Sequence, residues 1–216
     1  MRNIRHIVED YKYLIALLSV FNFLLTPLPI AVFKLEGAHV VVVNYTLVIL
    51  ASSLLANESR SKIRSYVLGL LALIVIWMEF SQPNFEIVKT LRLITTLALF
   101  ANFCFLLLNQ LRKIETITLQ FILGPILGFI YLGIIGGIFF EFAHFFDPNS
   151  FDLTTGFSSY AFYYFSFISI TTVGYGDIIP ISSSAQSITL VMNIIGQFYL
   201  AIVIAVFVGK YINVKS

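Results

Sequence analysis

The stretch of sequence that decides the fold is YAFYYFSFISITTVGYGD, which runs from Tyr160 to Asp177. Its first part is a mostly apolar run, too short to cross a bilayer core about 30 Å thick, since a spanning helix needs about 20 residues. The run ends at two threonines, and the glycines that follow do not continue a helix. Non-helical backbone at membrane depth is tolerated only where it is buried in protein or lines a water-filled cavity. The stretch therefore predicts a re-entrant half-helix over 159–170, capped by Ser158 or Ser159, and a loop that borders a pathway.

The composition places the rest of the chain in a membrane as well. Of its 216 residues, 59% are hydrophobic and 11% are charged, whereas charged residues make up about a quarter of a soluble domain. Six apolar runs are long enough for spanning helices. They lie near residues 13–33, 39–56, 64–81, 90–110, 118–143 and 185–209. The sequence predicts an all-α membrane protein with six transmembrane helices, and the re-entrant helix and its loop lie between the fifth and the sixth.

Positive charge is distributed unevenly between the predicted loops. With the amino terminus inside, ten of the 13 Lys and Arg residues lie on the inner side and three on the outer side. The inner ones are Arg2, Arg5, Lys12, Arg60, Lys62, Arg64, Arg112, Lys113, Lys210 and Lys215, and the outer ones are Lys34, Lys89 and Arg92. An excess of Lys and Arg is typical of cytoplasmic loops. We therefore expect a multi-pass protein of the cell membrane (plasma or inner) with both termini in the cytoplasm.

A polar segment, residues 111–116, separates the fourth predicted helix from the fifth. We place a domain boundary at residue 116. This gives a four-helix transmembrane bundle over 1–116 and a second membrane domain over 117–216, which holds the outer helix, the half-helix, its loop and the inner helix. The sequence has no internal repeat, so one chain supplies one copy of the loop.

The loop has the chemistry of a cation site built from oxygen atoms. Gly174 and Gly176 permit positive φ, so successive carbonyl groups can point to one side instead of alternating as they do in a strand. Stacked carbonyl oxygens can replace the water shell of an ion, and the hydroxyl group of Thr172 would add the innermost ligand. Val173 and Tyr175 would point away from the axis and brace the loop. Oxygen ligands of this kind suit a hard alkali cation.

Residues 172–177, TVGYGD, match the filter motif of the tetrameric potassium-channel family without a substitution, and the chain resembles that family from the outer helix to the inner helix. The resemblance implies a potassium-selective channel subunit with Asp177 at its outer mouth. The implied selectivity filter is Thr172, Val173, Gly174, Tyr175 and Gly176. The implied K+ sites are at Thr172, Val173, Gly174 and Tyr175. Because a ring of filter segments must surround the ion, the resemblance also implies a homotetramer with its pore on the four-fold axis.

Three positions near the filter depart from the pattern of some relatives. Tyr164 and Phe165 occupy the places of two tryptophans whose indole N–H groups bond the filter tyrosine and the aspartate; Tyr164 can still donate, whereas Phe165 cannot. Ile168 occupies the place of a glutamate that pairs with the position of Asp177 in some members. We infer a filter that is less tightly held. Our hypothesis is that conduction depends on external potassium, and currents as steady in low potassium as in high potassium would contradict it.

On the inner helix, residues spaced by three and four share one face. They are Gln197, Leu200, Ala201, Ile204 and Val208. We expect this face to line the pore, with a narrowing at Ile204 and Val208 that closes by dewetting. Gly196 stands where many family members have a glycine proposed as a hinge, and a close-packing contact is the alternative. Asn193 and Gln197 either face the water-filled cavity or form hydrogen bonds between helices.

The fourth predicted helix lacks the ladder of cations at every third position that voltage-gated relatives carry. Lys89 and Arg92 lie near its outer end, and no further charge follows until Arg112. Moving one charge through the whole field is worth about 2.3 kcal/mol per 100 mV, so two terminal cations give little leverage. We therefore predict that the channel is not strongly voltage-gated. Lys89 and Arg92 are expected to snorkel to the interface or to pair with Glu79 or Glu86.

Other functions fit the sequence less well. A non-selective cation channel of the same architecture would lack Tyr175 or have a shortened filter, and a potassium transporter subunit would carry several different filter segments in one long chain. An intramembrane enzyme would need a His-Glu-x-x-His motif, paired carboxylates or a nucleophile with a base, and the sequence has none of these. Beyond K+ and the lipid bilayer we expect no cofactor and no nucleic-acid partner. His144, in the outer loop, is either a proton sensor or an ordinary interfacial histidine.

Overall fold

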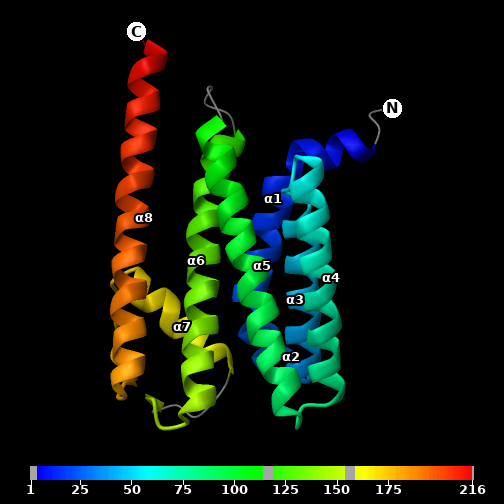
Figure 1. The fold of residues 1–216 in the computed structure, drawn as a ribbon, viewed down its shortest axis with the longest axis vertical. Coiled ribbons are helices and arrows are strands. Elements are labelled where there is room, and N and C mark those ends of the chain that lie inside the picture. Colours follow the sequence, from blue (N-terminus) through cyan, green and yellow to red (C-terminus); the bar gives the residue numbers. More distant parts are fainter. Residues whose placement is uncertain (1–3, 114–118, 154–158, 216) are drawn as a thin grey trace. The chain divides into compact units, whose positions relative to one another are not determined.

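The computed structural model of the chain describes residues 4–113, 119–153 and 159–215 (Figure 1). Within these ranges the chain divides into two compact units. The first comprises residues 4–113 and 119–128, and the second comprises residues 129–153 and 159–215. The predicted domain boundary at residue 116 lies outside the described residues, and the assignment of the two domains stays a prediction.

Five helices make up most of the first unit. They are α1 (Ile4–Leu24), α2 (Pro27–Phe33), α3 (Gly37–Ser53), α4 (Ser59–Ser81) and α5 (Glu86–Lys113). Helix α3 packs against α1 and α4, and α4 packs against α5. Edge-to-face aromatic contacts join Phe23 to Tyr45, with ring centroids 5.0 Å apart, and Tyr45 to Phe100, at 6.1 Å. These contacts connect α1, α3 and α5 in the core of the bundle.

The first helix of the chain is bent, whereas the sequence predicts one continuous span over 13–33. Helices α1 and α2 meet at an angle of 52°. Pro27 has no N–H group to donate to the carbonyl of Phe23. That carbonyl accepts instead from the backbone N–H of Thr26 at 3.1 Å and from the Thr26 hydroxyl group at 2.6 Å, and Asn44 of α3 donates to the same hydroxyl at 2.8 Å. The bend therefore leaves no orphaned carbonyl at Phe23.

The second unit contains most of α6 (Leu119–Phe146), the half-helix α7 (Ser159–Ile170) and the long helix α8 (Ser183–Lys215). Two short strands, β1 (Phe151–Leu153) and β2 (Ile178–Pro180), pair antiparallel, with Asp152 opposite Ile179. One cluster of buried apolar side chains joins these elements. Its members are Phe140, Ala143, Phe151, Phe162, Phe165, Ile168, Ile178, Ala185 and Met192.

Four described helices, α4, α5, α6 and α8, are long and apolar enough to cross a membrane, and the bent pair α1–α2 is a fifth if it forms one span. Helix α3 has 17 residues, about 26 Å of helix, and falls slightly short of the hydrocarbon thickness. Helix α7, with 12 residues, is about 18 Å long and cannot cross. The chain is a multi-pass, all-α membrane protein with a short apolar helix ahead of the loop, as the sequence predicts. Within the described residues four or five helices are of spanning length, where the sequence predicts six, because Pro27 breaks the first run and α3 ends at Ser53.

Candidate functional site

The half-helix α7 is held against glycines of α6. A Cβ atom added at Gly133 would lie 2.4 Å from the ring of Phe167, and one added at Gly136 would lie 2.2 Å from Ser166 Oγ. At those separations a Cβ atom would force Phe167 or Ser166 to shift, so glycine at both positions allows the close approach. The close approach lets the buried Ser166 hydroxyl donate to the carbonyl of Gly133 at 2.7 Å. This hydrogen bond between closely packed helices fixes α7 on α6. Helix α7 lies between residues 129–146 and α8 (Figure 1).

The carboxyl end of α7 passes into the loop through a left-handed residue. Thr172, two residues past the last helical position, has a φ of +62°. Its N–H donates to the carbonyl of Ser169 at 3.0 Å, and the N–H of Val173 donates to the carbonyl of Ile168 at 2.9 Å. This is the hydrogen-bond pattern of a Schellman motif, in which glycine usually occupies the position of Thr172. A threonine in the left-handed region costs about 1–2 kcal/mol, so the helix end holds the first residue of the predicted filter in a strained conformation.

The sign of φ alternates along the loop. It is +62° at Thr172, +53° at Gly174 and +78° at Gly176, and it is negative at Val173 and Tyr175 between them. Alternation of left- and right-handed backbone turns successive peptide groups the same way, so their N–H groups share one side and their carbonyl oxygens share the other. Positive φ at the two glycines was predicted, and positive φ at Thr172 was not. The signs of φ along the loop therefore agree with the predicted stack of oxygen ligands.

Two contacts fix the end of the loop that follows Gly176. The Tyr164 hydroxyl group donates to Asp177 Oδ2 at 2.8 Å. Directly after Asp177, β2 pairs with β1, and the N–H of Ile181 donates to the carbonyl of Ser150 at 2.8 Å. The ribbon was not predicted, because strands of three residues are too short to show an alternating pattern.

Phe165 and Ile168, the two apolar departures from the relatives' pattern, lie in the core behind the loop. They are 5% and 8% exposed. The ring of Phe165 lies 4.9 Å from that of Phe140 and 5.6 Å from that of Phe151. These side chains pack in the cluster that also contains Ile178, the residue after Asp177. The hydrogen bond expected from this group comes from Tyr164.

The side chains of the loop are largely uncovered in the single chain. Val173 is 50% exposed and Tyr175 is 73% exposed. No atom lies within 4 Å of a Cβ atom built at Gly174 or Gly176. The bracing predicted for Val173 and Tyr175 is therefore not supplied by the described part of one chain.

The predicted pore-lining face of α8 is also exposed in the single chain. This holds for Gln197, Leu200, Ala201 and Ile204. Val208 lies within α8, but its side chain is outside what the structure describes. The structure leaves the role of this face in permeation as a prediction.

Helix α8 contacts the end of α7 at two consecutive residues. A Cβ atom added at Gly196 would lie 2.9 Å from Ile170 Cβ, so Gly196 makes the close-packing contact that was one of its two expected roles. Gln197 Nε2 donates to the carbonyl of Ile170 at 3.2 Å. Asn193, one turn earlier, has a buried Oδ1 without a hydrogen-bond partner among the described residues. Of the two polar residues on this helix, Gln197 forms the bond between helices.

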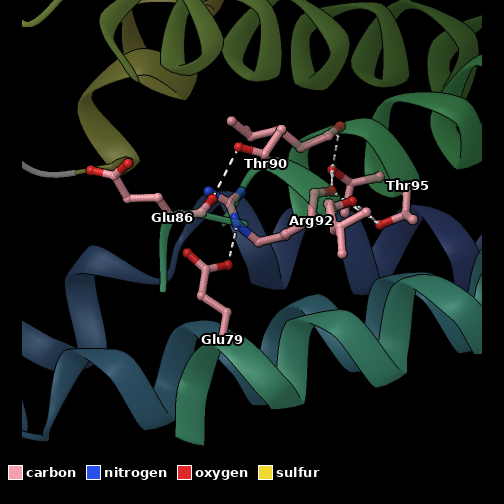
Figure 2. A network of polar contacts seen from close by, with 8 residues as sticks. Glu79, Glu86, Thr90, Arg92 and Thr95 are labelled. Carbon is pink, nitrogen blue, oxygen red and sulfur yellow. Dashed lines mark hydrogen bonds and ion pairs between the residues drawn. The ribbon is translucent and has the colours of Figure 1, made fainter. Parts of the chain in front are cut away.

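One ion pair in the first unit bears on voltage sensing. Figure 2 shows Glu79 of α4 reaching Arg92 of α5, and the two side chains are 21% and 12% exposed. The carbonyl of Arg92 also accepts from the Thr96 hydroxyl group at 2.6 Å. Pairing with Glu79 was one of the alternatives expected for Arg92. The charge lies near the ends of both helices, and residues 93–111 of α5 contain no charged side chain.

Residues 127–213 match a protein family described as "Ion channel". The matched segment begins in α6 and includes α7, the loop and α8. No curated protein matches the chain. Residues 127–213 therefore form an ion-channel pore domain, and this family is not a family of enzymes.

Proposed function

We propose that the chain is one subunit of a potassium-selective channel and that residues 172–176 form its selectivity filter. The ligands of K+ are the carbonyl oxygens of residues 172–175 together with the Thr172 hydroxyl group. The observation that carries the proposal is the alternating sign of φ over 172–176, because it turns successive carbonyl oxygens to one side. Rings of carbonyl oxygens from TVGYG loops replace the hydration shell of K+ in potassium channels.

We further propose that four copies of the chain form the pore. A single loop cannot enclose an ion, and a closed ring of identical subunits supplies the missing ligands. The exposure of Val173 and Tyr175 supports this assembly, since both side chains lack a cover in one chain. Large apolar side chains on the outer half of α8 are exposed as well. They are Leu190, Val191, Ile194, Ile195 and Phe198.

The proposed pathway continues inward along α8. It is lined by Leu200, Ala201, Ile204 and Val208; Gln197, which was predicted to share this face, donates its amide to the carbonyl of Ile170. A narrowing at Ile204 and Val208 closes by dewetting, because branched alkyl groups hold water poorly. The close contact between Gly196 and Ile170 supports a packing role for Gly196, and bending of α8 at this glycine stays a prediction.

We place the subunit in the cell membrane with both termini in the cytoplasm, on the distribution of Lys and Arg. Opening is proposed not to depend strongly on voltage. The support is that Arg92 is already paired with Glu79 and that no ladder of cations follows it on α5. Two terminal cations give little coupling to the membrane field.

The test is the reversal potential of the purified protein in planar bilayers, with potassium on one side and sodium on the other. We expect reversal near the potassium equilibrium potential and an open probability that is flat with voltage. Gly174→Ala should abolish selective current, because alanine is strained at a φ of +53°. Gly209→Ala is the matched control, since an added Cβ there meets no atom within 4 Å.

Each alternative has its own outcome in that experiment. Reversal near zero would favour a non-selective cation channel of the same architecture. Potassium flux without channel current would favour a transporter subunit. Native mass spectrometry tests the assembly separately, and we expect a complex of four times 24.4 kDa; a stable monomer or dimer that conducts would contradict the tetramer.

A further inference from the structure

The carboxyl end of α7 has a complete set of hydrogen bonds. The last four carbonyl groups of a helix have no partner within it, and a buried carbonyl needs one. The loop supplies three partners: Thr171 N–H for Phe167 at 3.1 Å, Thr172 N–H for Ser169 at 3.0 Å, and Val173 N–H for Ile168 at 2.9 Å. The fourth carbonyl, at Ile170, accepts from Gln197 Nε2 at 3.2 Å. The half-helix is thus capped partly by the filter and partly by α8.

The residue before Gln197 makes this bond possible. The backbone of Gly196 lies so close to Ile170 that an added Cβ would be 2.9 Å from Ile170 Cβ and 3.4 Å from its carbonyl oxygen. Ile170 is fully buried. The missing side chain at Gly196 therefore brings α8 near enough for the Gln197 amide to reach the carbonyl, and the two residues act on Ile170 together.

We propose that Gln197 is a positioning residue of the filter, which fixes the peptide at the end of α7 from α8 and so keeps Thr172 in its left-handed conformation. This inference rests on the proposed function of residues 172–176. Ile170 is two residues from Thr172, and without a donor its buried carbonyl is left unpaired. Rotation of the peptide between Ile170 and Thr171 would relieve that penalty. The same rotation would displace the neighbouring Thr172 N–H from Ser169.

Because the backbone of Thr172 is strained, the hydrogen bond from Gln197 to the carbonyl of Ile170 affects its conformation. A threonine at a φ of +62° stays there only while its surroundings enforce it. The Schellman bonds enforce it from the side of the loop, and Gln197 enforces it from the side of α8. Losing the second constraint should let Thr172 and its carbonyl move out of line with the other ligands.

The first test is hydrogen exchange of the amides at 171–174, measured by mass spectrometry on the full-length protein. Gln197→Met keeps the length of the side chain and removes the donor. We expect exchange about fivefold faster than in the wild type, the usual effect of one neutral hydrogen bond. Asn193→Leu is the control, because Asn193 lies on the same helix and makes no hydrogen bond to α7 among the described residues. Exchange at 171–174 that is unchanged in Gln197→Met would overturn the proposal.

The second test is the reversal potential with potassium and sodium on opposite sides of a planar bilayer. We expect the permeability ratio of Gln197→Met to fall about fivefold. Gln197→His should restore it at pH 8, where the neutral imidazole still has an N–H to donate. Faster exchange with an unchanged reversal potential would show a cap without a role in positioning the filter, and would also overturn the proposal.

If Gln197→Met does not assemble, Gln197→Glu gives the same test at pH 8, because the ionised carboxylate has the same shape and no donor. If the wild type itself reverses near zero, the proposed potassium selectivity fails. In that case the exchange measurement alone decides: faster exchange at 171–174 in Gln197→Met, with Asn193→Leu unchanged, would still support positioning by Gln197, and unchanged exchange would overturn it.

Discussion

The phenol of Tyr164 donates a 2.8 Å hydrogen bond to Asp177 Oδ2, across 13 positions of the chain, and joins the middle of α7 to the residue that follows the filter loop. The acceptor is a carboxylate, so the bond belongs to the stronger class, about 1.5–3 kcal/mol. Phe165 and Ile168 lie nearby in the core and add packing. The end of the loop at Asp177 therefore depends on this bond and on the β1–β2 ribbon.

Replacing Tyr164 by Phe should make conduction more sensitive to external potassium. The phenol is lost while the ring is kept, so Asp177 loses a donor and the outer end of the filter loosens. We expect currents in low external potassium to decay at least about tenfold faster than in the wild type, and currents in high potassium to stay steady. Recordings from reconstituted channels at both concentrations measure this.

A double-mutant cycle separates the bond from other effects of the ring. Asp177→Asn and the pair Tyr164→Phe with Asp177→Asn complete the cycle. The double variant should decay little faster than either single variant. Fully additive effects on the decay rate would mean that the two residues act independently, and equal decay in low and high potassium for the wild type would contradict the loosely held filter.

The sequence predicted best those features that depend on residues close together in the chain. The half-helix was predicted over 159–170 and is observed at Ser159–Ile170, because its short apolar run and the following threonines and glycines mark both its length and its end. The first span was predicted as one helix. Pro27 bends it, and its effect depends on how the Phe23 carbonyl finds another donor, which the apolar pattern does not reveal.

The contacts that position the proposed filter were predicted less well. Positive φ at Gly174 follows from the residue type, but positive φ at Thr172 follows from the Schellman bonds of α7. The bonds from Ser166 to Gly133 and from Gln197 to Ile170 join residues 33 and 27 positions apart. Such pairings depend on which helices pack together, and a single sequence gives no pairing signal for them.

Gly136→Ala should destabilise the second unit, which contains α7 and most of α6. The added Cβ would lie 2.2 Å from Ser166 Oγ and 3.1 Å from Met192 Cε, so α7 must move away from α6. Overpacking of this kind costs about 1–3 kcal/mol, which corresponds to a melting temperature lower by several degrees. Gly209→Ala, with no atom within 4 Å of the new Cβ, is the control and should melt no lower than the wild type. Equal melting of the two variants in detergent would contradict the close approach.

The Glu79–Arg92 pair should contribute to the stability of the first unit. Both side chains are mostly buried, so removing one partner leaves the charge of the other without its partner and poorly hydrated. We expect Glu79→Gln and Arg92→Gln each to lower the free energy of unfolding, with a coupling energy of about 1–3 kcal/mol in a double-mutant cycle, above the value for exposed pairs. Denaturant titrations of the four proteins measure it, and a coupling near zero would refute the contribution.

The same Arg92→Gln variant tests the proposal that the channel is not strongly voltage-gated. One charge near the end of α5 that hardly moves has little leverage, whereas a charge that crossed the field would contribute about 2.3 kcal/mol per 100 mV. We expect the open probability of Arg92→Gln to be as flat with voltage as that of the wild type. A change in the slope of the open probability with voltage would instead identify Arg92 as a gating charge.

Substitutions at Thr172 separate its backbone strain from its hydroxyl group. Thr172→Gly and Thr172→Ala both remove the predicted innermost oxygen ligand, but only glycine adopts a φ of +62° without strain. Both variants should therefore lose K+ conductance and selectivity to the same extent in bilayer recordings. Thr172→Gly should be the more stable of the two by about 1 kcal/mol in thermal unfolding. A Thr172→Ala channel as selective as the wild type would remove the hydroxyl from the set of ligands, and equal stability of the two variants would mean that the left-handed backbone at Thr172 is not under strain.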